Sequence, residues 1–414
     1  MQTPSPARSP RLLTTALALS LGAAISLGLA RFAYALLLPA MRADLGWSYF
    51  TAGAMNTANA AGYLAGALLM PRALARVDAH ALLLGGAGAT SLLLAAHGGV
   101  RADAALYALR ALAGVASAAV FVSGGLLAAR LGQVPGARPA LVLGLYYGGA
   151  GAGIVVSAAL VPGWRWPVAW ELLAGASLLA TLLLAWGTRA LAKPGAVASP
   201  QAASATSAPS ATSASSHPPA DRPAPSPATF RARDFAWGLL AYLMFGLGYI
   251  GYMTFIVTLL RGQGLGDGAV TAFYALLGFG TLASPWLWAG LLQRQRGGGA
   301  LAVLNALLAA ATLGAVMATH PVAVFASGAL FGAVFLSVVA STTALVRHNL
   351  PTTAWPAGIS AFTIVFAAGQ IVGPSVVGWV ADGPGGLRRG LALSAGALLL
   401  GAVLATRQKP LGGG

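Results

Sequence analysis

Apolar residues run along the chain in long blocks that short polar stretches separate. A block of about 20 apolar residues matches the helix length that crosses a hydrocarbon layer about 30 Å thick. Lipid offers the backbone no hydrogen-bond partner, so such blocks are predicted to be α-helices. The pattern predicts an all-α integral membrane protein of twelve transmembrane helices, at about 12–40, 51–70, 80–97, 104–129, 140–161, 167–188, 235–260, 270–292, 300–318, 322–346, 357–380 and 389–406.

A different kind of sequence separates the sixth block from the seventh. Residues 193–233 are mostly Ala, Ser, Thr and Pro, a composition that cannot bury a core and behaves as a flexible tether. We therefore expect a six-helix bundle over 1–192, a cytoplasmic linker over 193–233 and a second six-helix bundle over 234–414. A short internal repeat supports two related halves, because LGLARFAY at 27–34 aligns with FGLGYIGY at 245–252. Transporters built from such repeats bind substrate near the midplane, between the repeats.

Composition excludes most enzyme chemistry. Of the 414 residues, 57% are hydrophobic, 8% are charged and none is cysteine, so thiolate sites and Cys nucleophiles are excluded. There is one glutamate in the chain, which excludes a zincin site and a paired-Glu site. Lys193 and Lys409 are each followed by proline, so no Walker A loop exists. We expect no enzyme activity, no cofactor and no metal site.

The basic residues predict the orientation in the membrane. With the N-terminus inside, sixteen of the 24 Arg and Lys residues fall in the cytoplasm and six on the opposite side. That bias predicts a multi-pass protein of the inner (plasma) membrane with both termini cytoplasmic. We attribute the net charge of +16 to this topology signal and not to a surface that binds nucleic acid. The remaining two arginines, Arg31 and Arg110, fall inside predicted helices.

These two arginines are the first candidate substrate-binding residues. A charge at the centre of a transmembrane helix costs about 2.5–3.5 kcal/mol on insertion scales, so each guanidinium needs an anion, dipoles or water. Arg31 lies nine residues before Ala40, about 13 Å along a helix, and Arg110 lies six residues past Ala104, about 9 Å. The alternative is a side chain that snorkels to the membrane surface, which suits Arg110 better. Two guanidiniums in one half point to an anionic substrate.

Uncharged polar residues extend the candidate site. Buried amides and phenols need hydrogen-bond partners, so they face protein or water and not lipid. Each could instead be a helix-packing contact. Arg31 and Tyr34, like Asn56 and Asn59, are one turn apart and are predicted to share a helix face. The candidates are Tyr34, Asn56, Asn59, Tyr146, Tyr147, Tyr249, Tyr252 and Gln370, of which Tyr249 aligns with Arg31 in the repeat.

Glu171 is the candidate for proton coupling. It lies about five residues into the sixth predicted helix, and it is the one carboxylate predicted within a span. It carries a coupling proton only if it faces the interior. The alternatives are a structural salt bridge and a surface position.

Small residues in the fifth and eleventh predicted helices are candidates for helix packing and gating. Glycine lets two helix backbones approach closely, and glycine or proline permits local bending. We expect these helices to meet the eighth and second across the two halves, which would let the halves rock. The candidates are Gly148, Gly149 and Gly153 with Gly369, Gly373 and Pro374.

Three stretches carry a family resemblance. They are ARFAYALLLPAMRADLGWSYFTAGAMNTANAAGYLAGAL at 30–68, GLYYGGAGAGIVVSAALVPGWRW at 144–166 and AAGQIVGPSVVGWVAD at 367–382. The chain resembles the YbfB/YjiJ-type members of the major facilitator superfamily. The resemblance implies a secondary transporter that alternates between inward-open and outward-open states, with the first and fourth helices lining its cavity. The loop GALLMPRALARVDA at 66–79 departs from the superfamily's Gly-Asp-Arg-rich signature.

Together these features predict a secondary active transporter of a small anionic or polar metabolite. Its partners would be that substrate, the lipid bilayer and, if transport is coupled, protons. We expect no nucleic-acid partner, and we expect the protein to be a monomer. The alternatives are an efflux permease for drug-like or hydrophobic compounds and a non-transport membrane protein such as a lipid scramblase or receptor. A scramblase would need a polar groove that faces lipid. A receptor or enzyme would need a catalytic acid–base or metal constellation, which the composition does not supply.

Overall fold

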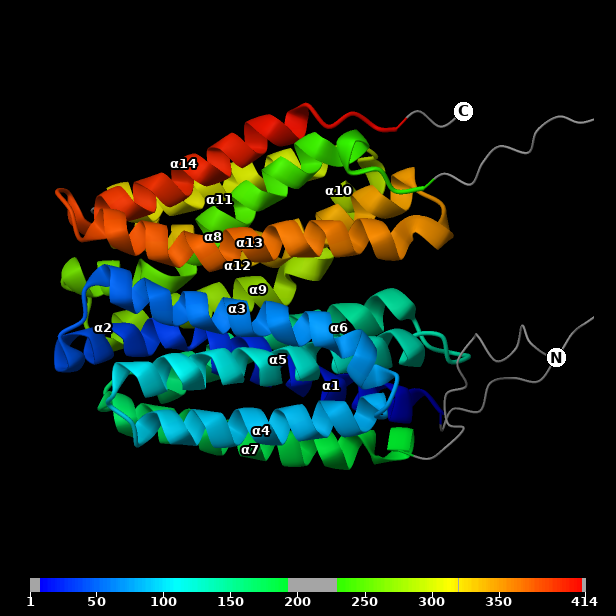
Figure 1. Cartoon of the computed structure of the whole chain (residues 1–414), viewed down its shortest axis with the longest axis horizontal. Helices are drawn as coiled ribbons and strands as arrows, with labels where there is room; N and C mark the ends of the chain where they lie inside the picture. The colour runs from blue at the N-terminus through cyan, green and yellow to red at the C-terminus, as the bar shows by residue number, and fades with distance from the viewer. Residues whose placement is uncertain (1–7, 193–228, 319, 412–414) are drawn as a thin grey trace, which may run out of the picture.

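The fold is two bundles of long helices lying one against the other (Figure 1). The computed structural model describes residues 8–192, 229–318 and 320–411. All the regular secondary structure in these ranges is helical. Most of the predicted linker, 193–228, lies outside the described residues.

The N-terminal half holds six spans. The first consists of α1 (Arg8–Ala23), the π-helix η1 (Ala24–Phe32) and α2 (Tyr34–Leu45). The others are α3 (Tyr49–Leu74), α4 (Ala79–Gly98), α5 (Asp103–Leu131), α6 (Pro139–Leu160) and α7 (Trp166–Thr188), which the short 3-10 helix η2 (Arg189–Ala192) extends.

The C-terminal half repeats the arrangement. Its spans are α8 (Ala236–Gly262), α9 (Asp267–Leu287) with α10 (Ala289–Arg294), α11 (Gly299–Met317), α12 (Pro321–Asn349), α13 (Trp355–Ala381) and α14 (Gly386–Thr406). The 3-10 helices η3 (Ala232–Phe235) and η4 (Thr352–Ala354) precede α8 and α13.

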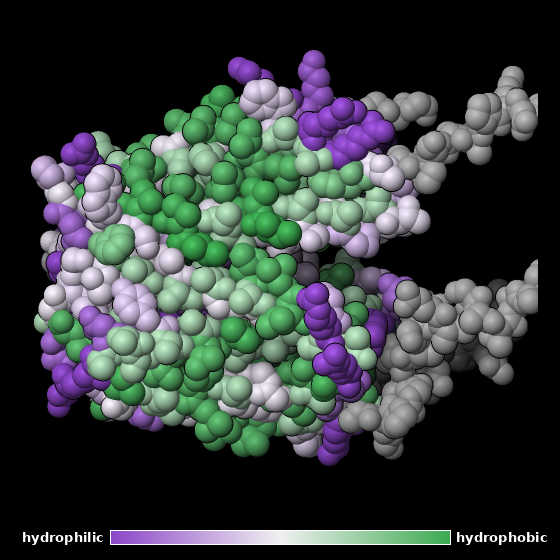
Figure 2. Space-filling view, viewed as in Figure 1, coloured by the Kyte–Doolittle hydropathy of each residue, from purple (hydrophilic) through white to green (hydrophobic). Residues whose placement is uncertain are grey.

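The predicted membrane fold is confirmed. Eleven helical segments in the described ranges are long and apolar enough to span a membrane. The remaining predicted span, 51–70, is the 26-residue helix α3, which packs between α5 and α13. Apolar side chains cover the sides of the bundle and polar ones gather at its ends (Figure 2). We call the end at which α1 and α8 begin the inner end, and the opposite end the outer end.

One predicted boundary was wrong, and one predicted span is divided. The first span continues past Ala40 to Leu45, where Gly46 ends the helix with a left-handed φ of 68°. The eighth span runs from Asp267 to Arg294 and covers the predicted range 270–292, but Trp288 divides it into α9, which carries Pro285 inside its last turn, and α10. A proline removes one backbone hydrogen bond and clashes with the preceding turn.

The two halves meet where α6 packs on α9 and α3 packs on α13, as the sequence predicted. A Cβ on Gly151 of α6 would lie 2.5 Å from the Gly278 carbonyl oxygen of α9. Gly53 of α3 abuts the carbonyl of Pro374 in the same way. Gly148 also faces α9, with its Cβ position 3.4 Å from the Leu282 carbonyl oxygen.

The other candidate glycines pack inside their own halves. Gly149 and Gly153 of α6 lie against the backbone of the first span, and Gly369 and Gly373 of α13 lie against α8. These four glycines therefore hold each bundle together, whereas Gly148 and Pro374 lie at the contact between bundles.

Replacing Gly153 by alanine is expected to destabilise the N-terminal half. The new Cβ would lie 2.5 Å from the Ala24 carbonyl oxygen and 2.8 Å from Cα of Gly28, and both atoms belong to backbone. Such overpacking costs about 1–3 kcal/mol. Thermal unfolding of the purified protein measures the effect. Gly175→Ala is the matched control, because nothing lies within 4 Å of its Cβ position; equal melting temperatures for the two variants would contradict the packing argument.

Candidate functional site

The first span is a π-helix for nine residues, and side chains from two other helices donate to the carbonyls of this segment. Arg110 of α5 donates to the Ala30 carbonyl at 3.0 Å, and Tyr274 of α9 donates to the Phe32 carbonyl at 2.6 Å. Ser157 of α6 lies 3.4 Å from the Gly28 carbonyl oxygen. Irregular backbone at membrane depth requires such partners, so the surrounding helices hold this conformation in place.

Arg110 is buried and its guanidinium is occupied by the protein. Besides Ala30, it donates to Oδ1 of Asn56 at 3.1 Å and to the Met55 carbonyl at 3.5 Å. Its guanidinium carbon also lies 4.5 Å from the centre of the Tyr34 ring. At 1% exposure the side chain does not snorkel to the outer surface. Arg110 ties α5 to α3 and to the first span.

Arg31 instead reaches across to the C-terminal half. Its Nη2 donates to Oε1 of Gln370 in α13 at 2.8 Å, and Nε2 of Gln370 donates to the Tyr249 hydroxyl of α8. The two residues that align in the internal repeat, Arg31 and Tyr249, therefore meet at one glutamine. The Nε of Arg31 is buried and has no hydrogen-bond partner among the described residues. This is a charged donor with capacity to spare at the contact between the halves.

Arg31 and Tyr34 do not share partners, although the sequence predicted one helix face for both. The Tyr34 hydroxyl donates to the Ala52 carbonyl at 2.9 Å, inside the N-terminal half. Arg31 lies in the π-helix, where the Ala33 amide bonds the Gly28 carbonyl five residues back. The wider turn changes the direction of Arg31 relative to Tyr34.

The two asparagines of α3 both contact Arg110. Nδ2 of Asn59 donates to its carbonyl at 3.0 Å, while Asn56 accepts from its side chain. Nδ2 of Asn56 also donates to Oγ1 of Thr254 in α8 at 2.7 Å, so Asn56 is a second polar link between the halves.

Aromatic rings surround Arg31 on the N-terminal side. The Arg31 guanidinium carbon lies 5.5 Å from the centre of the Tyr63 ring, which is 6.5 Å from Phe121. Phe121 in turn lies 5.7 Å from Tyr146 and 5.8 Å from Tyr147. Tyr146 is fully buried and bonds the Phe121 carbonyl, whereas Tyr147 is 42% exposed.

A stack of rings faces it from the C-terminal half. Tyr249 lies 4.7 Å from Phe245 and 5.6 Å from Phe366, with nearly parallel planes. Tyr252, one turn further along α8, packs on Phe331 at 3.8 Å and does not belong to this stack.

Glu171 does not face this site. It is exposed on α7, beside Gly98 at the end of α4. All seven carboxylates that the structure describes are exposed: Asp44, Asp78, Asp103, Glu171, Asp234, Asp267 and Asp382. The surroundings of Arg31 are therefore positive and aromatic, without a carboxylate from the described ranges.

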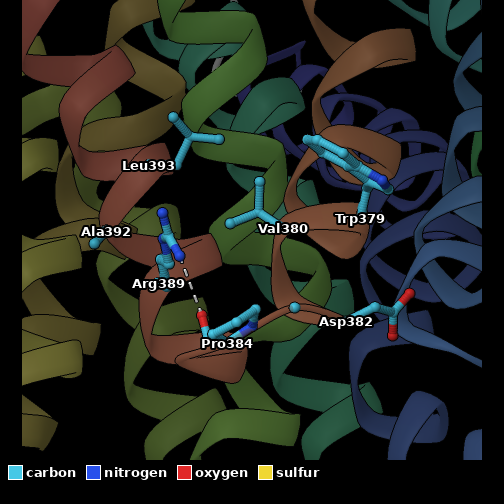
Figure 3. A pocket seen from close by; sticks show the side chains of 8 residues that line it. Trp379, Val380, Asp382, Pro384, Arg389, Ala392 and Leu393 are labelled. Carbon is cyan, nitrogen blue, oxygen red and sulfur yellow. Dashed lines mark hydrogen bonds between the residues drawn. The ribbon is translucent and has the colours of Figure 1, made fainter.

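Asp382 joins the two halves at the outer end of the molecule. This carboxylate, at the end of α13, accepts from the amides of Tyr49 at 2.7 Å and Phe50 at 2.9 Å, in the first turn of α3. An anion at a helix N-terminus satisfies free amides and the helix dipole. Asp382 also borders a shallow pocket between α13 and α14, which Trp379, Leu393 and Arg389 line (Figure 3). Twelve residues, about 18 Å of helix, separate Asp382 from Gln370.

Comparison with known proteins decides the family. Residues 23–406 match the family described as uncharacterised MFS-type transporter YbfB, where MFS stands for major facilitator superfamily. The chain belongs to this family. The resemblance seen in the sequence is thereby confirmed, and the family consists of transporters and not enzymes.

Solved structures show the same fold. The nucleoside transporter NupG, in a mutant form, has a TM-score of 0.67 at 14% identity, over 95% of this chain and 98% of that chain. A bacterial homologue of the human lysosomal transporter Spinster, inward-facing and unoccupied, has a TM-score of 0.64 at 14% identity, over 98% and 96%. Its occupied form scores 0.65 at 15% identity, over 98% of both chains. No curated protein sequence matches the chain. The protein is thus a multi-pass membrane protein with an MFS transporter fold.

Sequence reasoning missed two residues of the site, Tyr63 and Thr254. Tyr63 follows Asn56 and Asn59 at positions i+7 and i+4, so helical spacing could have placed all three on one face of α3. Thr254 gave no comparable signal, because its role depends on α3 and α8 lying side by side.

Proposed function

We propose that the chain is a secondary active transporter that carries a small anionic or polar metabolite by alternating access. One observation carries the proposal: the spare, buried Nε of Arg31 at the contact between the two halves. A guanidinium presents planar N–H donors that suit a carboxylate or a phosphate. Burial without a full set of partners costs free energy, which a bound anion would recover. Glu171, exposed on α7, is not part of the proposal.

The arrangement of the halves supports an inward-open state. The surface is hollowed between the halves at the inner end (Figure 2). Hydrogen bonds between the halves run from Asp382 at the outer end, through Thr57 and Asn56, to Arg31 and Gln370. Arg31 lies 14 residues before Leu45, about 21 Å from the outer end of its span. A substrate that enters from the inner end would therefore meet Arg31 below a closed outer gate. We propose that the inner end is cytoplasmic, in an inner (plasma) membrane.

Replacing Asp382 by asparagine is expected to loosen the outer gate. Asparagine keeps the size but loses the charge that binds two amides of α3, so the outward-open population should rise. The chain has no cysteine, so a single Ser375→Cys substitution provides a labelling site. Ser375 lies half-buried at the contact with Thr57, where Oγ and Oγ1 are 2.9 Å apart. A membrane-impermeant maleimide applied from the outer side should label Ser375→Cys several-fold faster in the Asp382→Asn background.

Asp44→Asn is the matched control for this variant. Asp44 also lies at the outer end, but it accepts from Arg101 at 2.9 Å and Trp166 at 2.8 Å, both within the N-terminal half. Labelling should stay unchanged in the control. Equal acceleration in both variants would show that general loosening, and not the contact between halves, governs access.

A screen of metabolite acids tests the proposed function itself. A ligand that binds only the folded protein raises its melting temperature, so purified protein is first screened by thermal shift. Acids that stabilise it are then tested for counterflow in proteoliposomes. We expect at least one acid to exchange across the membrane. If no acid or polar metabolite exchanged, the proposal of a transporter for this class would be abandoned.

A further inference from the structure

We propose that the site at Arg31 selects an organic acid with a single negative charge attached to a planar ring, and discriminates against dianions and amino acids. The inference rests on the proposed function and narrows its substrate class. Three features carry it: the number of free guanidinium donors, the position of the carboxylates and the placement of the aromatic rings.

The donors favour one negative charge. Arg31 has an unpartnered Nε beside the bond from its Nη2 to Gln370. Arg110 is poorly placed to serve a second anionic group, because each of its three nitrogens already donates within the protein, to Met55, Ala30 or Asn56, and its side chain is only 1% exposed. A ligand with two carboxylates would therefore bring one of them into the site without a cationic partner. Burying a charge without a partner is costly, so a dianion binds more weakly than a monoanion.

The absence of a described carboxylate next to Arg31 disfavours an amino group on the ligand. The seven described carboxylates are all exposed, and none contacts Arg31, Gln370 or Tyr249 in the bonds described above. An ammonium needs an anion or several acceptors when it leaves water. The nearest acceptors are the Gln370 amide, which already accepts from Arg31, and the Tyr249 phenol, which already accepts from Gln370. Amino acids, which carry both charges, are therefore discriminated against.

The rings favour a planar body. On the N-terminal side Tyr63 and Phe121 are half-buried and Tyr147 is 42% exposed, so none of these three rings is fully enclosed by the protein. On the opposite side Phe366 is half-buried. Aromatic pairs gain from offset-stacked and edge-to-face contacts beyond simple burial.

Phe366 has a rigid support. Its plane lies within 17° of those of Tyr242 and Phe245, at 4.8 and 5.3 Å, and these two rings are buried. A flat ring between the aromatic groups of the two halves would leave its acid group near Nε of Arg31. A polar, sugar-like body would lose its hydrogen bonds to water at such walls.

Benzoate is the probe for this proposal. Its binding to the purified protein is measured by equilibrium binding of radiolabelled benzoate, with competition by four related compounds. Benzamide keeps the ring and loses the charge, and phthalate adds a second charge. Phenylalanine adds an ammonium, and cyclohexanecarboxylate keeps the charge without planarity. We expect benzoate to bind about tenfold or more tightly than the first three, and about three- to tenfold more tightly than cyclohexanecarboxylate.

Two variants assign the effects to residues. Arg31→Gln should abolish benzoate binding. Tyr63→Leu should reduce the preference for benzoate over cyclohexanecarboxylate while leaving the binding of the latter within about threefold. Phe279→Leu, which replaces a ring on α9 that is 57% exposed, is the matched control and should change neither value.

Several outcomes would overturn the inference: no binding of benzoate by the wild-type protein, equal or tighter binding of phthalate or phenylalanine, or benzoate binding that survives in Arg31→Gln. Its failure is distinguishable from failure of the proposed function. If the acid screen found an exchanged ligand that is acyclic, dianionic or zwitterionic and depends on Arg31, the transporter proposal would stand and the monoanionic-ring proposal would fall. Absence of any exchanged ligand would remove both.

Discussion

Replacing Arg31 by glutamine is expected to abolish transport of the anionic substrate while leaving the protein folded. Removing one partner of a buried, hydrogen-bonded charge pair costs about 2–5 kcal/mol, which weakens ligand binding about 30-fold to several thousand-fold. The fold should survive, because a glutamine amide can still bond the Gln370 amide that Arg31 contacts in the structure. Counterflow in proteoliposomes and melting temperature without ligand measure the two effects separately.

Lysine at the same position provides a second comparison. Arg31→Lys keeps the charge but loses the planar fork, so binding should be weakened less than by glutamine and remain detectable. Arg165→Gln is the control, because it removes one positive charge from an exposed position at the outer end. Normal transport by Arg31→Gln would remove the observation on which the proposed function depends. A fall in transport by Arg165→Gln as large as that by Arg31→Gln would instead indicate a response to overall charge.

Replacing Arg110 by methionine is expected to act on stability first. Methionine fills much of the volume but leaves the Ala30 carbonyl and Oδ1 of Asn56 without their donor. Each buried acceptor that loses its bond costs about 1–3 kcal/mol. The melting temperature without ligand should therefore fall by several degrees, and expression in the membrane should fall with it.

Arg101→Met is the matched control for Arg110. Arg101 pairs with Asp44 at 2.9 Å on the surface, with side chains 57% and 41% exposed. Exposed pairs contribute about 0–1 kcal/mol, so this variant should melt close to the wild type. If Arg110→Met were as stable as Arg101→Met yet failed to transport, Arg110 would belong to the substrate site and not to the scaffold around it.

The fold could be predicted from the sequence because membrane burial leaves a coarse signal. Runs of apolar residues gave the spans, and glycines such as Gly148 marked helices that approach closely. The boundary at Ala40 was wrong because a local stop, Gly46, decided the end of that helix. Such stops act over a few residues, whereas hydropathy averages over about 20.

The candidate site was only partly predictable. The sequence identified both arginines, since a charge inside an apolar run is conspicuous, but it could not distinguish their partners. Arg110 donates to a backbone carbonyl of the π-helix, and no residue pattern in the sequence predicted that helix. Arg31 meets Gln370, 339 residues away, and that contact depends on how the halves pack. Residues at one helix spacing are predictable, whereas contacts between halves follow from the tertiary structure.

The π-helix before Tyr34 has a mechanical consequence. In a segment bonded five residues back, each amide has a nearby alternative acceptor four residues back, so the bonding register can shift without leaving the backbone unsatisfied. Such a shift turns every residue that follows it about the helix axis. Arg31 is near the end of the segment, and the carbonyls of Ala30 and Phe32 are held by Arg110 and Tyr274, one from each half. Separating the halves would release Tyr274 from Phe32, and the first span would then be free to rewind and point Arg31 elsewhere.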